Sequence, residues 1–132
     1  MSIEAVRRIC RTLPGVSEDV KWGNDLVFSV GGKMFAVVDL EPPHAIAFKC
    51  SEEVFGELVE RLGIIPAPYL ARAKWVQETE FGETLDLREL AELLRAAHGI
   101  VASKLPKSRR PLAAGSAAKR KAKRTKPRTK AR

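Results

Sequence analysis

Residues 26–40 read LVFSVGGKMFAVVDL and predict a β-hairpin. β-Branched and aromatic residues favour strands on both sides, and the glycines at positions 31 and 32 tolerate the positive φ of a two-residue turn. If these glycines form the whole turn, the cross-strand pairs are Val30–Lys33, Phe28–Phe35 and Leu26–Val37. The two phenylalanines would then mark the buried face of the sheet.

Helices and further strands are expected on both sides of this hairpin. Apolar residues at helical spacing predict amphipathic helices over residues 3–13, 52–62 and 87–105, capped by Ser2, Ser51 and Asp86. Strand patterns cover residues 45–50 and 74–78. The order helix, three strands, helix, one or two strands, helix predicts an α+β fold in which helices pack against one face of a twisted antiparallel sheet.

The formal net charge of +8 is divided unevenly along the 132 residues. Residues 1–105 hold 12 Lys+Arg and 16 Asp+Glu, for a net charge of −4, whereas residues 106–132 hold 12 Lys+Arg and no acid, for +12. From residue 113 onward, no large apolar side chain is present to offset the entropy lost on ordering. The sequence therefore predicts a folded domain over residues 1–110 and a disordered basic tail over residues 111–132.

Several functional classes are not expected. The N-terminus has no apolar run typical of a secretory signal, and no segment reaches the roughly 18 uninterrupted apolar residues of a membrane span. Cys10 and Cys50 form no CxxC pair and read as reduced, small hydrophobes. A pairing of either cysteine with His44 or His98 stays open, but no Ser/His/Asp arrangement or nucleophile elbow is present. We expect a cytoplasmic protein without enzymatic activity, bound metal or cofactor.

A series of short motifs runs along nearly all of residues 1–110: LPGV (13–16), WG (22–23), VGGKMFA (30–36), FK (48–49), PAPYL (66–70), WV (75–76) and KLPK (104–107). Together they resemble the MmcQ/YjbR-like family. The resemblance implies a two-layer domain, α-β(3)-α-β(2)-α, often described as a CyaY-like or double-wing DNA-binding fold. It brings no catalytic motif. The added tail is similar in composition to the basic ends of linker histones.

Lysine and arginine side chains that approach phosphates release condensed counterions and bind without reading bases. We therefore predict a DNA-binding protein that recognises mainly the phosphate backbone. The nucleoid is one location open to such a protein, and RNA stays open as a partner. The candidate contacts are Lys33, Lys49, Arg72, Lys74, Lys107, Arg109, Arg110, Lys119, Arg120, Lys121, Lys123, Arg124, Lys126, Arg128, Lys130 and Arg132. For the four in the strand region, ordinary solvated lysines and arginines at strand ends are an equally good interpretation.

An alternative belongs to another class of protein. The folded domain would be a protein-interaction or small-ligand module, and its tail would only tether it near nucleic acid. A cleft lined by exposed rings of Trp22, Phe35, Tyr69 and Trp75 would favour this alternative, whereas packed rings and a basic wing would disfavour it. No membrane partner is expected, and the oligomeric state stays open, with a monomer as the first expectation.

Overall fold

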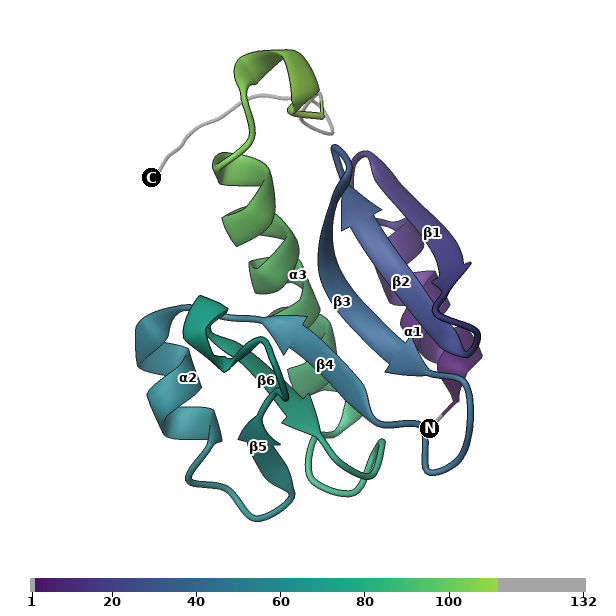
Figure 1. Ribbon diagram of the computed structural model, residues 1–132, viewed down its shortest axis with the longest axis vertical. Helices are drawn as coiled ribbons and strands as arrows, with labels where there is room; N and C mark the ends of the chain where they lie inside the picture. The colour runs from purple at the N-terminus through teal and green to yellow at the C-terminus, as the bar shows by residue number, and fades with distance from the viewer. Residues whose placement is uncertain (1, 112–132) are drawn as a thin grey trace.

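The computed structural model describes residues 2–111, in which one antiparallel sheet is backed by helices (Figure 1). The elements in chain order are α1 (Ile3–Arg11), β1 (Val16–Lys21), β2 (Asp25–Val30), β3 (Lys33–Asp39), β4 (Ile46–Lys49), α2 (Glu52–Leu58), β5 (Ile64–Pro66), the 3₁₀ helix η1 (Ala71–Ala73), β6 (Trp75–Glu78), α3 (Leu87–Ser103) and the 3₁₀ helix η2 (Lys107–Arg109).

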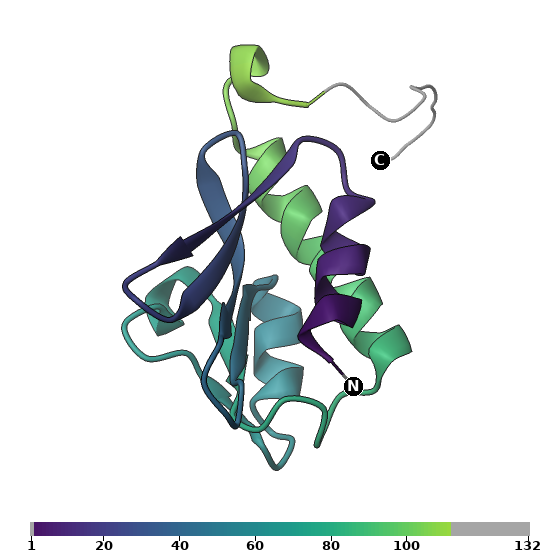
Figure 2. The same ribbon diagram turned by 90° about the vertical axis from the view of Figure 1, so that its right-hand side faces the viewer.

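The sheet has six strands in the order β1-β2-β3-β4-β6-β5, and all neighbours are antiparallel. Figure 2 shows α1, α2 and α3 on one side of this sheet. The longest of them, α3, packs across β2, β3 and β4, and the buried core runs from Val6 in α1 to Leu105 just beyond α3. The predicted two-layer α+β architecture is confirmed, with one more strand before α2 than expected.

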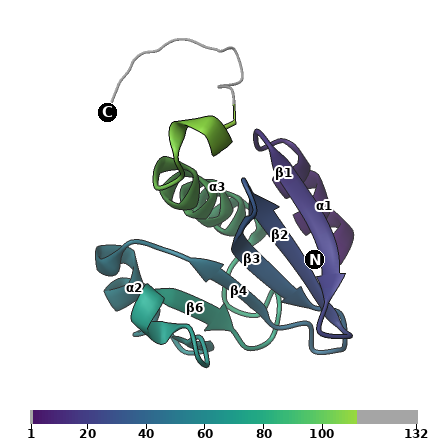
Figure 3. The ribbon, with the colours of Figure 1, turned by 45° about the horizontal axis from the view of Figure 1, so that its top comes forward.

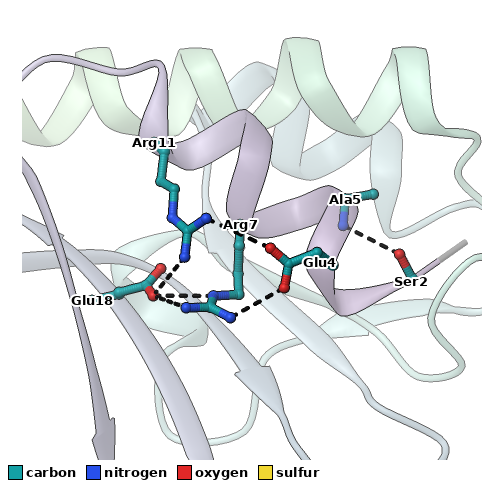
Figure 4. A network of polar contacts seen from close by, with 6 residues as sticks. All are labelled: Ser2, Glu4, Ala5, Arg7, Arg11 and Glu18. Atoms are coloured by element: carbon teal, nitrogen blue, oxygen red, sulfur yellow. Dashed lines mark hydrogen bonds and ion pairs between the residues drawn. The ribbon is translucent and has the colours of Figure 1, made fainter.

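That additional strand is β1, an edge strand that pairs with β2. Its sequence VSEDVK has little strand character, and most of its residues are exposed. Glu18 accepts hydrogen bonds from Arg7 Nε and Nη2 at 3.0 and 2.6 Å, and Arg11 lies 3.5 Å away, so α1 covers this strand with arginines (Figure 4). One face of β1 is thus held against α1 by ion pairs and hydrogen bonds. The strand therefore forms without the alternating apolar residues that usually indicate one.

The β2–β3 register differs from the simple hairpin. Val30 faces Lys33 as predicted, but Phe28 pairs with Ala36 and Leu26 with Val38. The shift arises because Phe35 is an extra residue on β3, a β-bulge opposite the Phe28/Ser29 step. The bulge lets Phe35 and Ala36 both be fully buried, and the Phe35 ring meets the imidazole of His98 edge-on, with 5.5 Å between ring centroids.

All three predicted helix caps are formed. Ser2 and Ser51 each accept a backbone N–H through the side-chain oxygen at 3.2 Å, and Asp86 accepts one at 2.8 Å. Helix α2 is shorter than predicted because it ends at Leu58, and Leu62 is exposed rather than on a buried stripe. The sequence therefore predicted the first residue of each helix correctly, whereas the helices end earlier than predicted.

One carboxylate, that of Glu78, lies inside the protein at 1% exposure. It accepts backbone N–H bonds from Gly82 at 3.0 Å, Thr84 at 2.8 Å and Leu85 at 2.7 Å. These bonds satisfy three donors in the β6–α3 connection, so Glu78 fixes the path of the chain into α3.

Candidate nucleic-acid interface

The cations predicted from the folded domain lie at one end of the sheet. There the end of β4 and the start of β6 meet the C-terminal turn of α3, and Lys49, Lys74 and Lys104 line a hollow of about 390 Å³. The Lys49 ammonium donates a hydrogen bond to the carbonyl of Ala73 in η1, the short helix that also carries Arg72. Three ammonium groups thus line one hollow, and the exposed Arg72 lies in the adjoining 3₁₀ helix.

The electrostatics of the hollow reflect this crowding. Partial burial lowers the pKa of Lys49 below its ordinary value, and the neighbouring charges of Lys104 and Lys74 lower it further. Lys74 is held 4.9 Å from the centroid of the Phe55 ring, a cation–π arrangement. An anion bound between these ammonium groups would relieve their mutual repulsion. Glu52, which begins α2, lines the same hollow, so the rim is not purely basic.

The β2–β3 turn joins this end through close packing against η2. A Cβ placed on Gly31 would lie 2.5 Å from Leu105 Cδ1 and 2.9 Å from the carbonyl oxygen of Arg109. The Arg110 guanidinium donates to the carbonyl oxygens of Leu105 at 2.9 Å and Ser103 at 3.1 Å, which ties the segment after α3 to the helix end. Lys33 follows the glycine turn and is exposed.

We call this region the basic end: Lys33, Lys49, Arg72, Lys74, Lys104, Lys107, Arg109 and Arg110. Sequence reasoning named all of them except Lys104, whose place in the KLPK motif at a helix terminus was the available signal. The other nine predicted contacts lie outside the described residues, as does the predicted disorder of the tail: Lys119, Arg120, Lys121, Lys123, Arg124, Lys126, Arg128, Lys130 and Arg132.

The four rings of the alternative cleft do not lie together. Phe35 is fully buried and Trp75 is 4% exposed, so both belong to the interior. Trp22 and Tyr69, in contrast, are 69% and 104% exposed and line a groove of about 440 Å³. The groove lies on the sheet face opposite the three α-helices, so half of the expected cleft is present.

The cysteines and histidines do not pair in the described part of the chain. His44 Nδ1 lies 3.0 Å from the carbonyl oxygen of Asp39, and His98 Nε2 lies 2.8 Å from that of Pro14. Burial raises the pKa of Cys10 to about 12 and that of Cys50 to about 11, so both thiols stay protonated at neutral pH.

Within residues 2–111, no group of three or more metal-ligating side chains gathers, and no helix is long and apolar enough to cross a membrane.

A scan of protein families matches residues 11–100 to the YjbR family model, which is more than half of the chain. The chain belongs to the YjbR family. Among solved structures, a Deinococcus radiodurans protein with a DUF419 domain is similar, with 30% sequence identity, a TM-score of 0.73, and coverage of 83% of this chain and 85% of that one. A Pseudomonas syringae protein shares the fold at 17% identity and a TM-score of 0.64, over 76% of this chain and 99% of that one. No match was found among curated proteins.

The family assignment confirms the resemblance drawn from the sequence motifs. The YjbR match covers the sheet and most of α3 but ends at residue 100. Lys104, Lys107, Arg109 and Arg110 follow that boundary, as does the whole run of cations after residue 118. Much of the positive charge of this YjbR protein therefore lies beyond the matched domain.

Proposed function

We propose that this YjbR-family protein binds nucleic acid, duplex DNA above all, through the phosphate backbone and largely without reading bases. The observation that carries the proposal is the net charge of +12 over residues 106–132, which begins at an end of the folded body where further cations gather. Each Lys or Arg that neutralises a phosphate releases condensed counterions, and this release supplies affinity independent of sequence.

The expected salt dependence follows from the number of cations. Nine Lys and Arg lie between residues 119 and 132. At roughly −0.9 per neutralised phosphate, their full engagement gives a slope of about −8 in a plot of log K against log salt concentration. A protein with this many contacts would lose on the order of 10³- to 10⁵-fold in affinity between 50 and 200 mM salt.

The folded body has a supporting role in this proposal. Lys33, Arg72 and Lys104 are exposed and would add phosphate contacts from the folded body. Backbone contacts of this kind position a protein without specifying sequence. RNA offers the same phosphates, so it stays open as a second partner after duplex DNA. A protein that binds DNA in this way would be associated with the nucleoid in the cell. It includes no catalytic step.

The test compares the full chain with residues 1–111. The shortened chain retains every member of the described core, which ends at Leu105, so it should fold. We expect the full chain to bind a duplex of mixed sequence at moderate salt and the shortened chain to lose most of that affinity. Equal affinity of the two chains would show that the tail is not the binding element.

A matched pair of variants in the full chain tests the body. Lys33→Ala/Arg72→Ala/Lys104→Ala removes three cations from the basic end, and Arg8→Ala/Arg88→Ala/Arg95→Ala removes three exposed cations from helices α1 and α3. We expect a clearly larger loss of affinity from the first triple variant. Equal losses would mean that only total charge matters and that the basic end makes no contacts of its own.

A second candidate function is a ligand- or protein-binding module. The groove of about 440 Å³ with exposed Trp22 and Tyr69 favours it, because a small soluble domain seldom exposes two large rings around one concavity. If residues 1–111 alone bind a partner through this groove, and the affinity does not change with salt, the result would support this second candidate over the first.

A further inference from the structure

The sheet face opposite the helices carries the groove with Trp22 and Tyr69, hereafter the open-face groove. Its floor is formed by small and medium apolar side chains of β3 and β4, including Val37 and Ala47, and one wall by the segment Ala67–Leu70. The three α-helices lie on the other side of the sheet (Figure 2). This face is therefore apolar, concave and uncovered within residues 2–111.

Two carboxylates give the open-face groove its charge. Asp25 begins β2, Asp39 ends β3, and the two are direct register partners that both line the groove. Asp39 accepts a backbone N–H from Glu41 at 2.9 Å, and neither aspartate forms an ion pair with a cation of the described chain. Burial raises the pKa of Asp25 above its ordinary value, and the adjacent charge of Asp39 raises it further. Lys21 is the register partner of Asp25 on β1 but forms no ion pair with it, so a further cation placed here would find two carboxylates without a bound counter-charge.

The exposed rings suit the same occupant. The faces of Trp and Tyr attract the cationic groups of lysine and arginine, at exposed sites as well as buried ones. The methylene stems of these side chains can also cover apolar surface while their charged ends stay hydrated. A groove with two exposed rings and two carboxylates thus fits a chain segment rich in lysine and arginine.

The C-terminal segment of this chain has that composition and the necessary reach. The described chain ends at Pro111, next to Gly15, where a Cβ on the glycine would lie 2.7 Å from Pro111 Cβ. Figure 3 shows this end of the described chain near the start of β1. From there β1 leads to Trp22 over residues 16–22, a path of about 23 Å at roughly 3.3 Å per residue. Residues 112–118 can span about 23–25 Å when extended, so the run of cations from Lys119 begins within reach of Trp22.

We propose that the open-face groove is a docking site for the chain's own segment 119–132, with lysine and arginine stems along Trp22 and Tyr69 and their charges toward Asp25 and Asp39. The contact is intramolecular and is made of individually weak interactions. Because the same cations would bind phosphates, the groove and a nucleic acid compete for them, and docking restrains the tail. The docking itself is independent of the proposed function; only the competition rests on it.

The first experiment compares amide and indole NMR spectra of the full chain, residues 1–111 and full-length Asp25→Asn/Asp39→Asn at low salt. We expect the Trp22 indole and groove amides to differ between the full chain and residues 1–111, and the aspartate variant to resemble the shortened chain. Adding a DNA duplex to the full chain should return the groove signals to those of residues 1–111. Groove signals that coincide in the full and shortened chains would overturn the proposal and leave the groove to a foreign ligand.

The second experiment measures duplex affinity with a control matched for charge. Asp25→Asn/Asp39→Asn and Glu57→Gln/Glu60→Gln each remove two negative charges, but Glu57 and Glu60 lie exposed on or just after α2. We expect the groove variant to gain at least about threefold more affinity than the control, because it also releases the tail. Equal gains would contradict the competition. If the groove signals respond to the tail but no chain binds DNA, the docking stands and the proposed function fails.

Discussion

Replacing Gly31 by alanine tests how the β2–β3 turn is joined to the basic end. Gly31 has a φ of +58°, and an added Cβ would lie 2.5 Å from Leu105 Cδ1 and 2.9 Å from the carbonyl oxygen of Arg109. Gly32, the next residue, has a φ of +82° but nothing within 4 Å of its Cβ position. The two glycines therefore share the backbone requirement and differ in the space around them.

The magnitudes follow from these two contributions. An L-residue in the left-handed region costs about 1–2 kcal/mol, which applies to alanine at either position. Crowding a packed site adds about 1–3 kcal/mol, which applies to Gly31→Ala alone. We expect Gly31→Ala to lower the free energy of unfolding by about 2–5 kcal/mol and Gly32→Ala by about 1–2 kcal/mol.

Urea unfolding of both variants, followed by tryptophan fluorescence, measures the difference. The φ of Gly32 is larger than that of Gly31 and suits alanine no better. A larger loss of stability in Gly31→Ala therefore cannot come from the backbone angle and must come from the crowding. Relief of the crowding would require η2 to move, so Gly31→Ala should also shift the NMR signals of Arg109 and Arg110. Equal destabilisation by the two variants, with unchanged signals from η2, would refute the close packing of the turn against the basic end.

Three further predictions concern the interior and the β1 edge. Glu78→Ala should lower the free energy of unfolding by about 2–4 kcal/mol in urea, because three backbone N–H groups would lose the carboxylate that accepts their hydrogen bonds. A loss below about 1 kcal/mol would argue against a structural role of these bonds. Cys10 and Cys50, with pKa values raised to about 12 and about 11, should react with a disulfide reagent at pH 8 only after unfolding; rapid labelling of the native protein would contradict their burial. The hydrogen bond from Arg7 lowers the pKa of Glu18, so the stabilisation is present above its unfolded pKa of about 4.3 and is lost as the pH falls through the lower folded value. Glu18→Gln should therefore lower the thermal midpoint at pH 7 more than at pH 3, and an equal drop at both would exclude the ion pair as the cause.

Features governed by neighbouring residues could be predicted from the sequence. The caps at Ser2, Ser51 and Asp86 each bond a backbone N–H three residues ahead, so a short motif contains all that is needed. The turn at the two glycines of the β2–β3 hairpin followed in the same way from local chemistry.

Features that depend on distant residues could not be predicted. The bulge at Phe35 exists because His98 and the core accept a second buried residue on β3, and nothing near the hairpin indicates this. Strand β1 relies on arginines of α1, so its own residues carry no alternating apolar pattern. Lys104 joins Lys49 and Lys74 only through the packing of α3 on the sheet, and the open-face groove likewise assembles from five separate segments.

The proposal that a C-terminal polycation binds phosphates is tested most directly by the salt dependence of duplex affinity, measured for the full chain and for residues 1–111. The nine cations between residues 119 and 132 predict that the two slopes of log K against log salt differ by about 8, with the full chain the steeper. Equal slopes for the two chains, or binding of the full chain that hardly changes with salt, would contradict it.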